Sequence, residues 1–156
     1  MATSTNIQYL VATGKDELGA TVSLKTPSNR RQIETFLSGA AITAGDWVMF
    51  DTAATDAARV LTVVQATFNA AGQPLTVGVA LNAATAAGQN VDVVVDGYVE
   101  GANVANGVAT GQALGIITVA GRAQLNVAGA LGPPCGVTLE ASVVANTCDV
   151  WVIKNF

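Results

Sequence analysis

The sequence predicts a mostly β protein: a small antiparallel β-barrel with an N-terminal arm and a C-terminal hairpin. Three observations predict this class. Apolar and polar residues alternate over residues 91–100, as on a strand with one buried face, because strand side chains point to opposite sides in turn. Other short runs are rich in Val, Leu and Thr, which favour strands. A Gly-Gln turn precedes such runs at residues 70–73, 86–89 and 110–112.

Residues 1–38 are predicted to form an arm or peripheral layer, and residues 39–156 the barrel domain. The first region lacks sustained alternation and contains only short strand-like pieces, at 7–12 and 20–24. We therefore expect the barrel to stay folded when residues 1–38 are removed.

The end of this arm has the pattern of a short helix. Asn29 is a candidate N-cap and Gln32 follows three residues later, the spacing of a capping box. Apolar side chains then share one face at helical spacing, and Gly39 ends the run; they are Ile33, Phe36 and Leu37.

The barrel strands are expected from residue 41 onward. A turn at 43–46 leads into a strand at 47–51, and further strands are predicted at 59–65 and 75–81. In the clearest strand one face carries Val91, Val93, Val95 and Val99, whereas the other carries Asp92, Asp96, Tyr98 and Glu100, with Val94 as the one apolar exception. Glycines at 78 and 97 indicate bulges or bends that close a barrel.

The remaining elements follow the same rules. Residues 114–119 form a predicted strand, and 132–134 an irregular connector. The C-terminal hairpin, 136–153, pairs 136–144 with 148–153 through a turn at 145–147. No long helix is expected.

The composition excludes several functions. The chain has 156 residues, of which 51% are hydrophobic and 12% charged, about half the charge of a typical domain, and it has no histidine. Histidine-dependent nucleophiles and imidazole metal sites are therefore excluded. A net charge of −4 argues against nucleic-acid binding. No apolar run reaches the length of a membrane span, and no secretory signal is visible, so we expect synthesis in a cytoplasm.

The carboxylates give no catalytic pair within one strand. Asp92, Asp96 and Glu100 lie four residues apart, about 13 Å along a strand, which is too far for the paired acids of a glycosidase. A catalytic pair with a carboxylate from another strand, such as Asp51 or Glu140, stays open as an alternative. Otherwise we expect these charges to be solvated on the outer face of the strand.

The two cysteines do not form a zinc or redox motif. Cys135 and Cys148 lie on the two arms of the predicted hairpin and lack the Cys-x-x-Cys spacing. Buried free thiols are expected, and a cross-strand disulfide is the alternative.

Five residues are candidates for contact with a partner. Arg30 and Arg31 form either a solvated turn or a contact with an acidic protein, because Arg is enriched at interfaces. Tyr98 is the aromatic residue on the polar face of its strand. Phe36 and Trp151 complete the set, as aromatic side chains that serve as core or interface anchors.

Three stretches carry a resemblance to a known family. They read "ITAGDWV" at 42–48 leading to Asp51, "LTVGVAL" at 75–81, and "AAGQNVDVVVDGYVE" at 86–100. In this order they resemble the capsid decoration (cement) proteins of tailed bacteriophages, over about residues 40–119. The resemblance does not cover the N-terminal arm or the terminal hairpin.

The resemblance implies a β-barrel subunit, commonly trimeric, that binds outside the capsid and fastens neighbouring coat subunits, with contacts from an N-terminal arm. It implies no catalytic residues, cofactor or metal. We therefore expect a structural virion protein and not an enzyme. It would be made in the host cytoplasm and located on the capsid surface, as a homotrimer bound to the major capsid protein and to neither nucleic acid nor a membrane.

Three alternatives to a decoration protein stay open. The chain could be another phage head or tail component. It could be a carbohydrate- or surface-binding β module, in which Tyr98 and Trp151 would stack on sugar rings. The third alternative is a carboxylate hydrolase.

Overall fold

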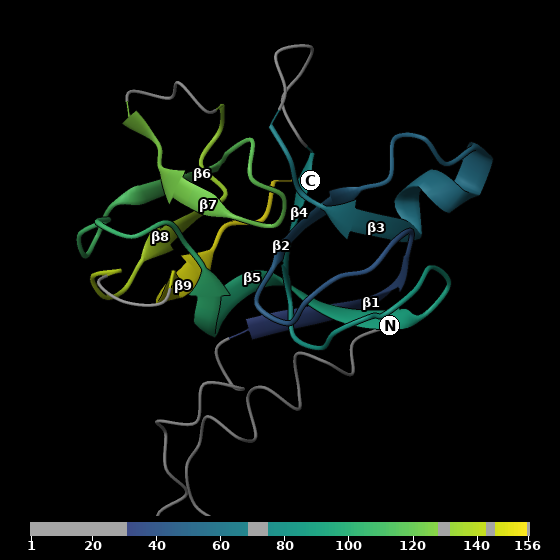
Figure 1. Ribbon diagram of the computed structural model, residues 1–156, viewed down its shortest axis with the longest axis horizontal. Coiled ribbons are helices and arrows are strands. Elements are labelled where there is room, and N and C mark those ends of the chain that lie inside the picture. Colours follow the sequence, from purple (N-terminus) through teal and green to yellow (C-terminus); the bar gives the residue numbers. More distant parts are fainter. Residues whose placement is uncertain (1–30, 69–74, 128–131, 143–145, 156) are drawn as a thin grey trace, which may run out of the picture.

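The computed structural model describes residues 31–68, 75–127, 132–142 and 146–155, and its fold is mostly β, as predicted (Figure 1). Arg30 and the strand-like pieces at 7–12 and 20–24 lie outside them. In these ranges no helix is long and apolar enough to cross a membrane. The elements are β1 (Arg31–Ser38), β2 (Trp47–Phe50), the 3-10 helix η2 (Asp56–Val60), β3 (Thr62–Gln65), β4 (Thr76–Ala80), β5 (Asn90–Asn103), β6 (Ala113–Ile116), β7 (Ala123–Leu125), β8 (Gly136–Thr138) and β9 (Thr147–Val152).

The first five strands form the predicted barrel. Their order is β1-β3-β2-β4-β5, and β1 also pairs with β5, which closes the sheet on itself. The β1–β3 pair is parallel and the other pairs are antiparallel. Closure removes free strand edges and encloses small apolar side chains. The enclosed core consists of Phe36, Ile42, Val48, Val63, Val77, Ala80, Ala84, Val91, Val93 and Val95.

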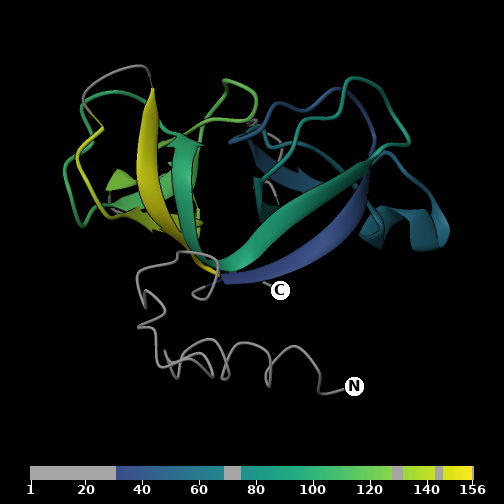
Figure 2. The same cartoon turned by 90° about the horizontal axis from the view of Figure 1, so that it is seen from below.

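The long strand β5 belongs to two lobes. Its first half pairs with β1 and β4 in the barrel, and its second half pairs with β9. From β9 the sheet continues through β8 and β6 to β7. Figure 2 shows β5 bending between the lobes, with β1 in blue along one half and β9 in yellow along the other. β8 and β9 pair antiparallel, as in the predicted C-terminal hairpin, but the first strand ends at Thr138 and not at residue 144.

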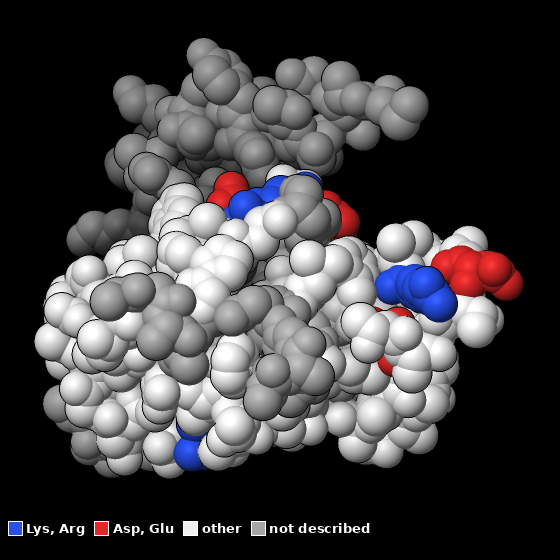
Figure 3. Space-filling view, turned by 90° about the horizontal axis from the view of Figure 1, so that it is seen from above, with Lys and Arg blue, Asp and Glu red and all other residues white. Residues whose placement is uncertain are grey.

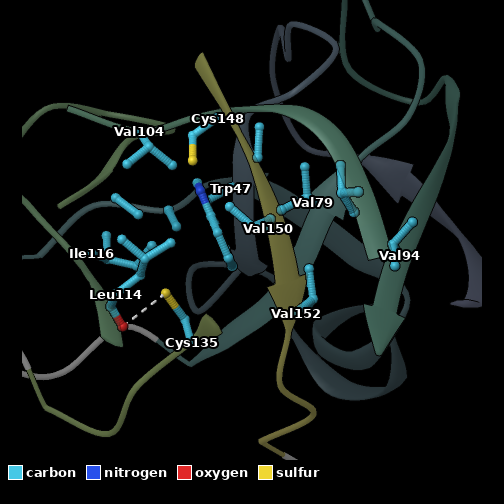
Figure 4. Close-up of a cluster of buried hydrophobic side chains, with 14 of the residues drawn as sticks. Trp47, Val79, Val94, Val104, Leu114, Ile116, Cys135, Cys148, Val150 and Val152 are labelled. Carbon is cyan, nitrogen blue, oxygen red and sulfur yellow. Dashed lines mark hydrogen bonds between the residues drawn. The ribbon is translucent and has the colours of Figure 1, made fainter. Parts of the chain in front are cut away.

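A second core fills the space between the barrel wall and these additional strands. Trp47 lies on barrel strand β2 but packs into this second core, where its side chain is fully buried (Figure 4). Val79 on β4 and Val94 on β5 also point from the barrel wall into this second core. The barrel sheet is therefore apolar on both faces at this point, and a strict alternation of apolar and polar residues is lost.

This second core corrects the predicted face of β5. Val91, Val93 and Val95 share the barrel core, but Val99 packs in the second core together with Val94. The register of the β1–β5 pair shifts between Val94 and Asp96, because these two residues pair with consecutive residues of β1. Gly97 has a φ of 104°. Only glycine adopts this conformation without strain, so the strand bends there and changes the core that its apolar side chains meet.

A buried polar network joins the lobes at the turn before β2. Asp46 Oδ2 accepts hydrogen bonds from the Thr43 backbone N–H at 2.9 Å and from Gln65 Nε2 at 2.6 Å. Its Oδ1 accepts one from Asn103 Nδ2 at 3.1 Å, and Arg122 Nε donates to Asn103 Oδ1 at 3.0 Å. These donors offset the cost of burying the carboxylate.

The prediction of a short helix near residues 29–37 is wrong, because residues 31–38 form strand β1. Seven residues of β1 have register partners on β5, from Arg31↔Gly97 to Leu37↔Asn90. Phe36 and Ser38 are buried, while Leu37 between them is exposed, which is the alternation of a strand. Long-range pairing with β5 thus overrides a local capping pattern. Removing residues 1–38 would delete a barrel strand, so the expectation that the barrel survives this deletion is also corrected.

Two smaller corrections concern element bounds. The predicted strand 59–65 begins only at Thr62, because Arg59 and Val60 end η2. Val60 is 60% exposed, so this apolar residue lies on the surface and not in a buried strand. Strand β7 was not predicted, since a three-residue strand is too short to show a period.

Candidate interaction surface

The outer side of β5, β9 and β8 carries an aromatic row. Tyr98 on β5 pairs with Trp151 on β9, which pairs in turn with Val137 on β8. Val99, Val150 and Val152, next to Tyr98 and Trp151 along their strands, pack in the second core, and Gly136 and Thr138 on either side of Val137 are buried, so the row points outward. Trp151 is 38% exposed, although most large side chains of these strands are buried.

A second row lies beside the first. Glu100 and Gly101 form a bulge opposite Asp149, and Leu139 follows Val137 outward on the β8 side, with its N–H bonded to the Asp149 carbonyl at 2.8 Å. Glu100 and Leu139 are exposed. We call the two rows together the outer aromatic face; it comprises Tyr98, Trp151, Val137, Glu100, Asp149 and Leu139.

Hydrogen bonds fix Asp149 and Tyr98 on this face. The Tyr98 hydroxyl donates to Asp149 Oδ2 at 2.6 Å, and the Gly101 N–H donates to Asp149 Oδ1 at 3.1 Å. The Asp149 N–H donates to Glu140 Oε1 at 3.2 Å, which brings a further carboxylate to the edge of the face. Because both carboxylate oxygens of Asp149 have a donor, the two rows are held in one geometry.

The face is electronegative. The hydrogen bond to Asp149 raises the pKa of Tyr98 to about 12, helped by burial and by the charges of Asp149, Glu100 and Glu140. The charged groups that act on the phenol are thus all carboxylates, and each makes a phenolate more costly. A nucleophilic or basic phenolate is therefore not available near neutral pH.

The structure brings together two of the five predicted contact residues. Tyr98 and Trp151 are cross-strand neighbours, and Arg31 on β1 lies beside Gly97, adjacent in sequence to Tyr98. Phe36 is a correction: it is buried in the barrel and packs edge-to-face on Phe50, with ring centroids 6.0 Å apart. Arg30 lies outside the described residues.

Sequence reasoning missed Val137 and Leu139. Alternation alone would place the apolar Val137 and Leu139 inward, whereas the structure buries Gly136 and Thr138 instead. Two apolar residues separated by threonine are too few to predict a face. Only the pairing with β9 places them beside Trp151.

The other carboxylates in the described part of the chain are not gathered into one reactive site. Asp92 accepts a hydrogen bond from the Thr35 hydroxyl at 2.7 Å, and Asp96 pairs with Gln32 across β1 and β5. Asp51 accepts a hydrogen bond from the backbone N–H of Ala53 at 3.0 Å. Within the described ranges no group of three or more His, Cys, Asp or Glu side chains is placed to hold a metal ion.

Both cysteines are free and buried, as expected. Cys135 donates weakly to the Leu114 carbonyl at 3.4 Å (Figure 4), and Cys148 to the Glu140 carbonyl at 3.2 Å. Burial raises the pKa of Cys135 to about 12 and also raises that of Cys148. Both are core thiols and not reactive thiolates.

A second apolar area lies at the η2 end of the barrel. A cavity of about 210 Å³ is lined by Phe50, Asp51, Thr52, Arg59, Val60 and Leu75. Charged atoms are sparse on the face in Figure 3, where a blue and a red group stand together over the protruding end that carries η2. This end belongs to the barrel lobe, and the outer aromatic face belongs to the other.

Comparisons with known proteins give no family for the chain. No family profile matches it, and no curated protein matches it.

Proposed function

We propose that this chain is a structural virion protein that binds the outside of an assembled capsid and stabilises contacts between major capsid subunits. The proposal includes no enzymatic activity. It places the protein on the capsid surface after synthesis in the host cytoplasm, as a homotrimer that contacts neither nucleic acid nor a membrane.

The outer aromatic face is the observation that carries this proposal. Trp151, Tyr98, Val137 and Leu139 form an aromatic and aliphatic patch on three paired strands, with carboxylates at its edge. Tyr and Trp on rigid elements bury large areas at low entropic cost, and they are enriched where proteins meet. A patch of this kind on a monomer is typical of an interaction surface.

The scarcity of charge supports attachment to a repeating surface. Only 12% of the residues are charged, whereas a freely dispersed domain has about a quarter. A subunit that binds the assembled lattice and not its free components stabilises the lattice by mass action. Because many copies attach at once, each interface can be modest in size.

A carbohydrate-binding module is the second candidate, and one observation favours it. Tyr98 and Trp151 are neighbours, and the Asp149 carboxylate is fixed beside them at 2.6 Å from the Tyr98 hydroxyl. Aromatic planes next to a fixed acceptor are suited to stacking on a sugar ring and accepting its hydroxyl hydrogens. Both oxygens of Asp149 already accept a hydrogen bond, however, which leaves less capacity for a sugar.

Co-sedimentation tests the proposal. The purified chain is mixed with expanded, empty capsid shells of the phage that encodes it, and we expect it to pellet with the shells in a saturable way. Trp151→Ala should weaken binding about tenfold or more, as expected for an interface aromatic anchor. Leu61→Ala is the matched control, because Leu61 is an exposed apolar residue at the other lobe, and it should bind like the wild type.

Two outcomes contradict the proposal. The first is wild-type protein that stays in the supernatant at every shell concentration. The second is retention on a glycan array that Trp151→Ala abolishes, without binding to shells, which would transfer the function to the carbohydrate-binding module.

A further inference from the structure

The charge of the outer aromatic face specifies what it can accept. Glu100 is exposed, and Asp149 and Glu140 lie around the same phenol. Lys154 lies two residues beyond the end of β9, and its ammonium is 3.3 Å from Glu34 on β1. This ion pair is with a carboxylate of β1 and not with one of the outer aromatic face.

An uncharged apolar partner would fit this face poorly. Covering Trp151 and Tyr98 would also remove water from Glu100, and a carboxylate that loses water without gaining a partner is costly. A partner must therefore supply both a flat surface for the rings and a hydrogen-bond donor for the Glu100 carboxylate.

A guanidinium group supplies both. It stacks on the face of an indole or phenol ring through cation–π attraction, and its N–H groups match the geometry of a carboxylate. A lysine ammonium can pair with Glu100 but cannot stack as a plane. We infer that the outer aromatic face docks a protein segment that presents arginine side chains, an inference that rests on the proposed function of binding a coat protein.

The test uses the full chain and a defined peptide. Acetyl-(Gly-Arg)3-amide is titrated at low salt while tryptophan emission is recorded, with the citrulline peptide of the same length as the uncharged probe. Trp47 is fully buried and gives a constant background, so a change in emission reports on Trp151. We expect the arginine peptide to bind more tightly than the citrulline peptide, with an advantage that shrinks at high salt.

Charge variants locate the contact. Glu100→Gln should weaken binding of the arginine peptide about two- to fivefold, the range of one exposed charge pair, and leave the citrulline peptide unaffected. Asp56→Asn is the matched control: it removes one exposed negative charge from η2, and Asn tolerates the positive φ of that position. It should leave both affinities unchanged.

Three results overturn the inference. They are equal affinities for the two peptides, equal effects of Glu100→Gln and Asp56→Asn, and a change in Trp151 emission with a neutral hexasaccharide but not with the arginine peptide. The sedimentation assay separates this failure from that of the proposed function. Suppose that the wild-type protein pellets with shells and that Glu100→Gln and Asp56→Asn pellet to the same extent. The proposed function is then supported, and the inference of an arginine partner is wrong.

Discussion

The two tryptophans of the chain provide a matched pair for testing how the second lobe is held. Trp47 is fully buried between β2 and the second core, whereas Trp151 points outward from β9. The same substitution, Trp→Ala, therefore removes a core anchor at one position and a surface side chain at the other. We expect Trp47→Ala to destabilise the fold strongly and Trp151→Ala to leave it nearly intact.

The magnitudes follow from burial. Truncating a buried tryptophan costs about 3–5 kcal/mol, since the lost transfer free energy is added to the cost of a cavity. Domains of this size have a free energy of unfolding of about 5–15 kcal/mol, so the loss is a large part of the total. Trp151 contributes cross-strand contacts with Tyr98 and Val137, each worth about 0.2–1 kcal/mol, so its truncation costs about 1 kcal/mol.

The assay is urea unfolding followed by far-ultraviolet circular dichroism, which reports mainly on the backbone and does not rely on tryptophan emission. The midpoint should fall far for Trp47→Ala and little for Trp151→Ala, with similar slopes. Cys135 should also react faster with a thiol reagent in Trp47→Ala, because it shares the second core. Equal losses of stability from the two substitutions would refute the assignment of Trp47 to the core and of Trp151 to the surface.

Three further predictions concern single groups. In a titration at 295 nm, Tyr98 should ionise near pH 12, because the hydrogen bond to Asp149 raises its pKa. Since the folded-state pKa is higher than the unfolded value of about 10, this group's contribution to stability is complete below about pH 10 and is lost as pH rises toward 12. Asp149→Asn should lower the pKa of Tyr98, and an unchanged pKa would show that the hydrogen bond is not its main cause. Cys135 should resist a thiol reagent in the native protein and react at once in denaturant; fast native reaction would contradict its burial. Gly78→Ala should destabilise the barrel by about 1–3 kcal/mol or more in urea unfolding, since an added Cβ would collide with the Val94 backbone carbonyl; a neutral effect would show that β4 and β5 can separate there without cost.

The deletion test of the N-terminal arm also changes with the structure. Residues 31–38 are the strand that closes the barrel, so a deletion that ends at residue 38 would remove both the arm and the β1 pairings. A deletion of residues 1–30 leaves β1 in place. It is therefore the variant that asks whether the arm contributes to capsid binding.

The sequence by itself determined the class of the fold and the character of its surface. Alternation along β5, Val-rich runs and small-residue turns specify short strands, because side-chain period and turn chemistry are local properties. The low charge and the absence of histidine also belong to the composition alone. Tyr98 could be selected as a contact residue because it is the aromatic residue on the polar face of its own strand.

Tertiary structure decided everything that depends on pairing between distant residues. Residues 31–38 became a strand because β5 offers a complete register of partners, although their local pattern favours a helix. Val94 and Val99 share a core because β5 bends at Gly97 between two lobes. The outer aromatic face exists because β9 places Trp151 between Tyr98 and Val137, and contacts between residues so far apart along the chain leave no period in the sequence to read.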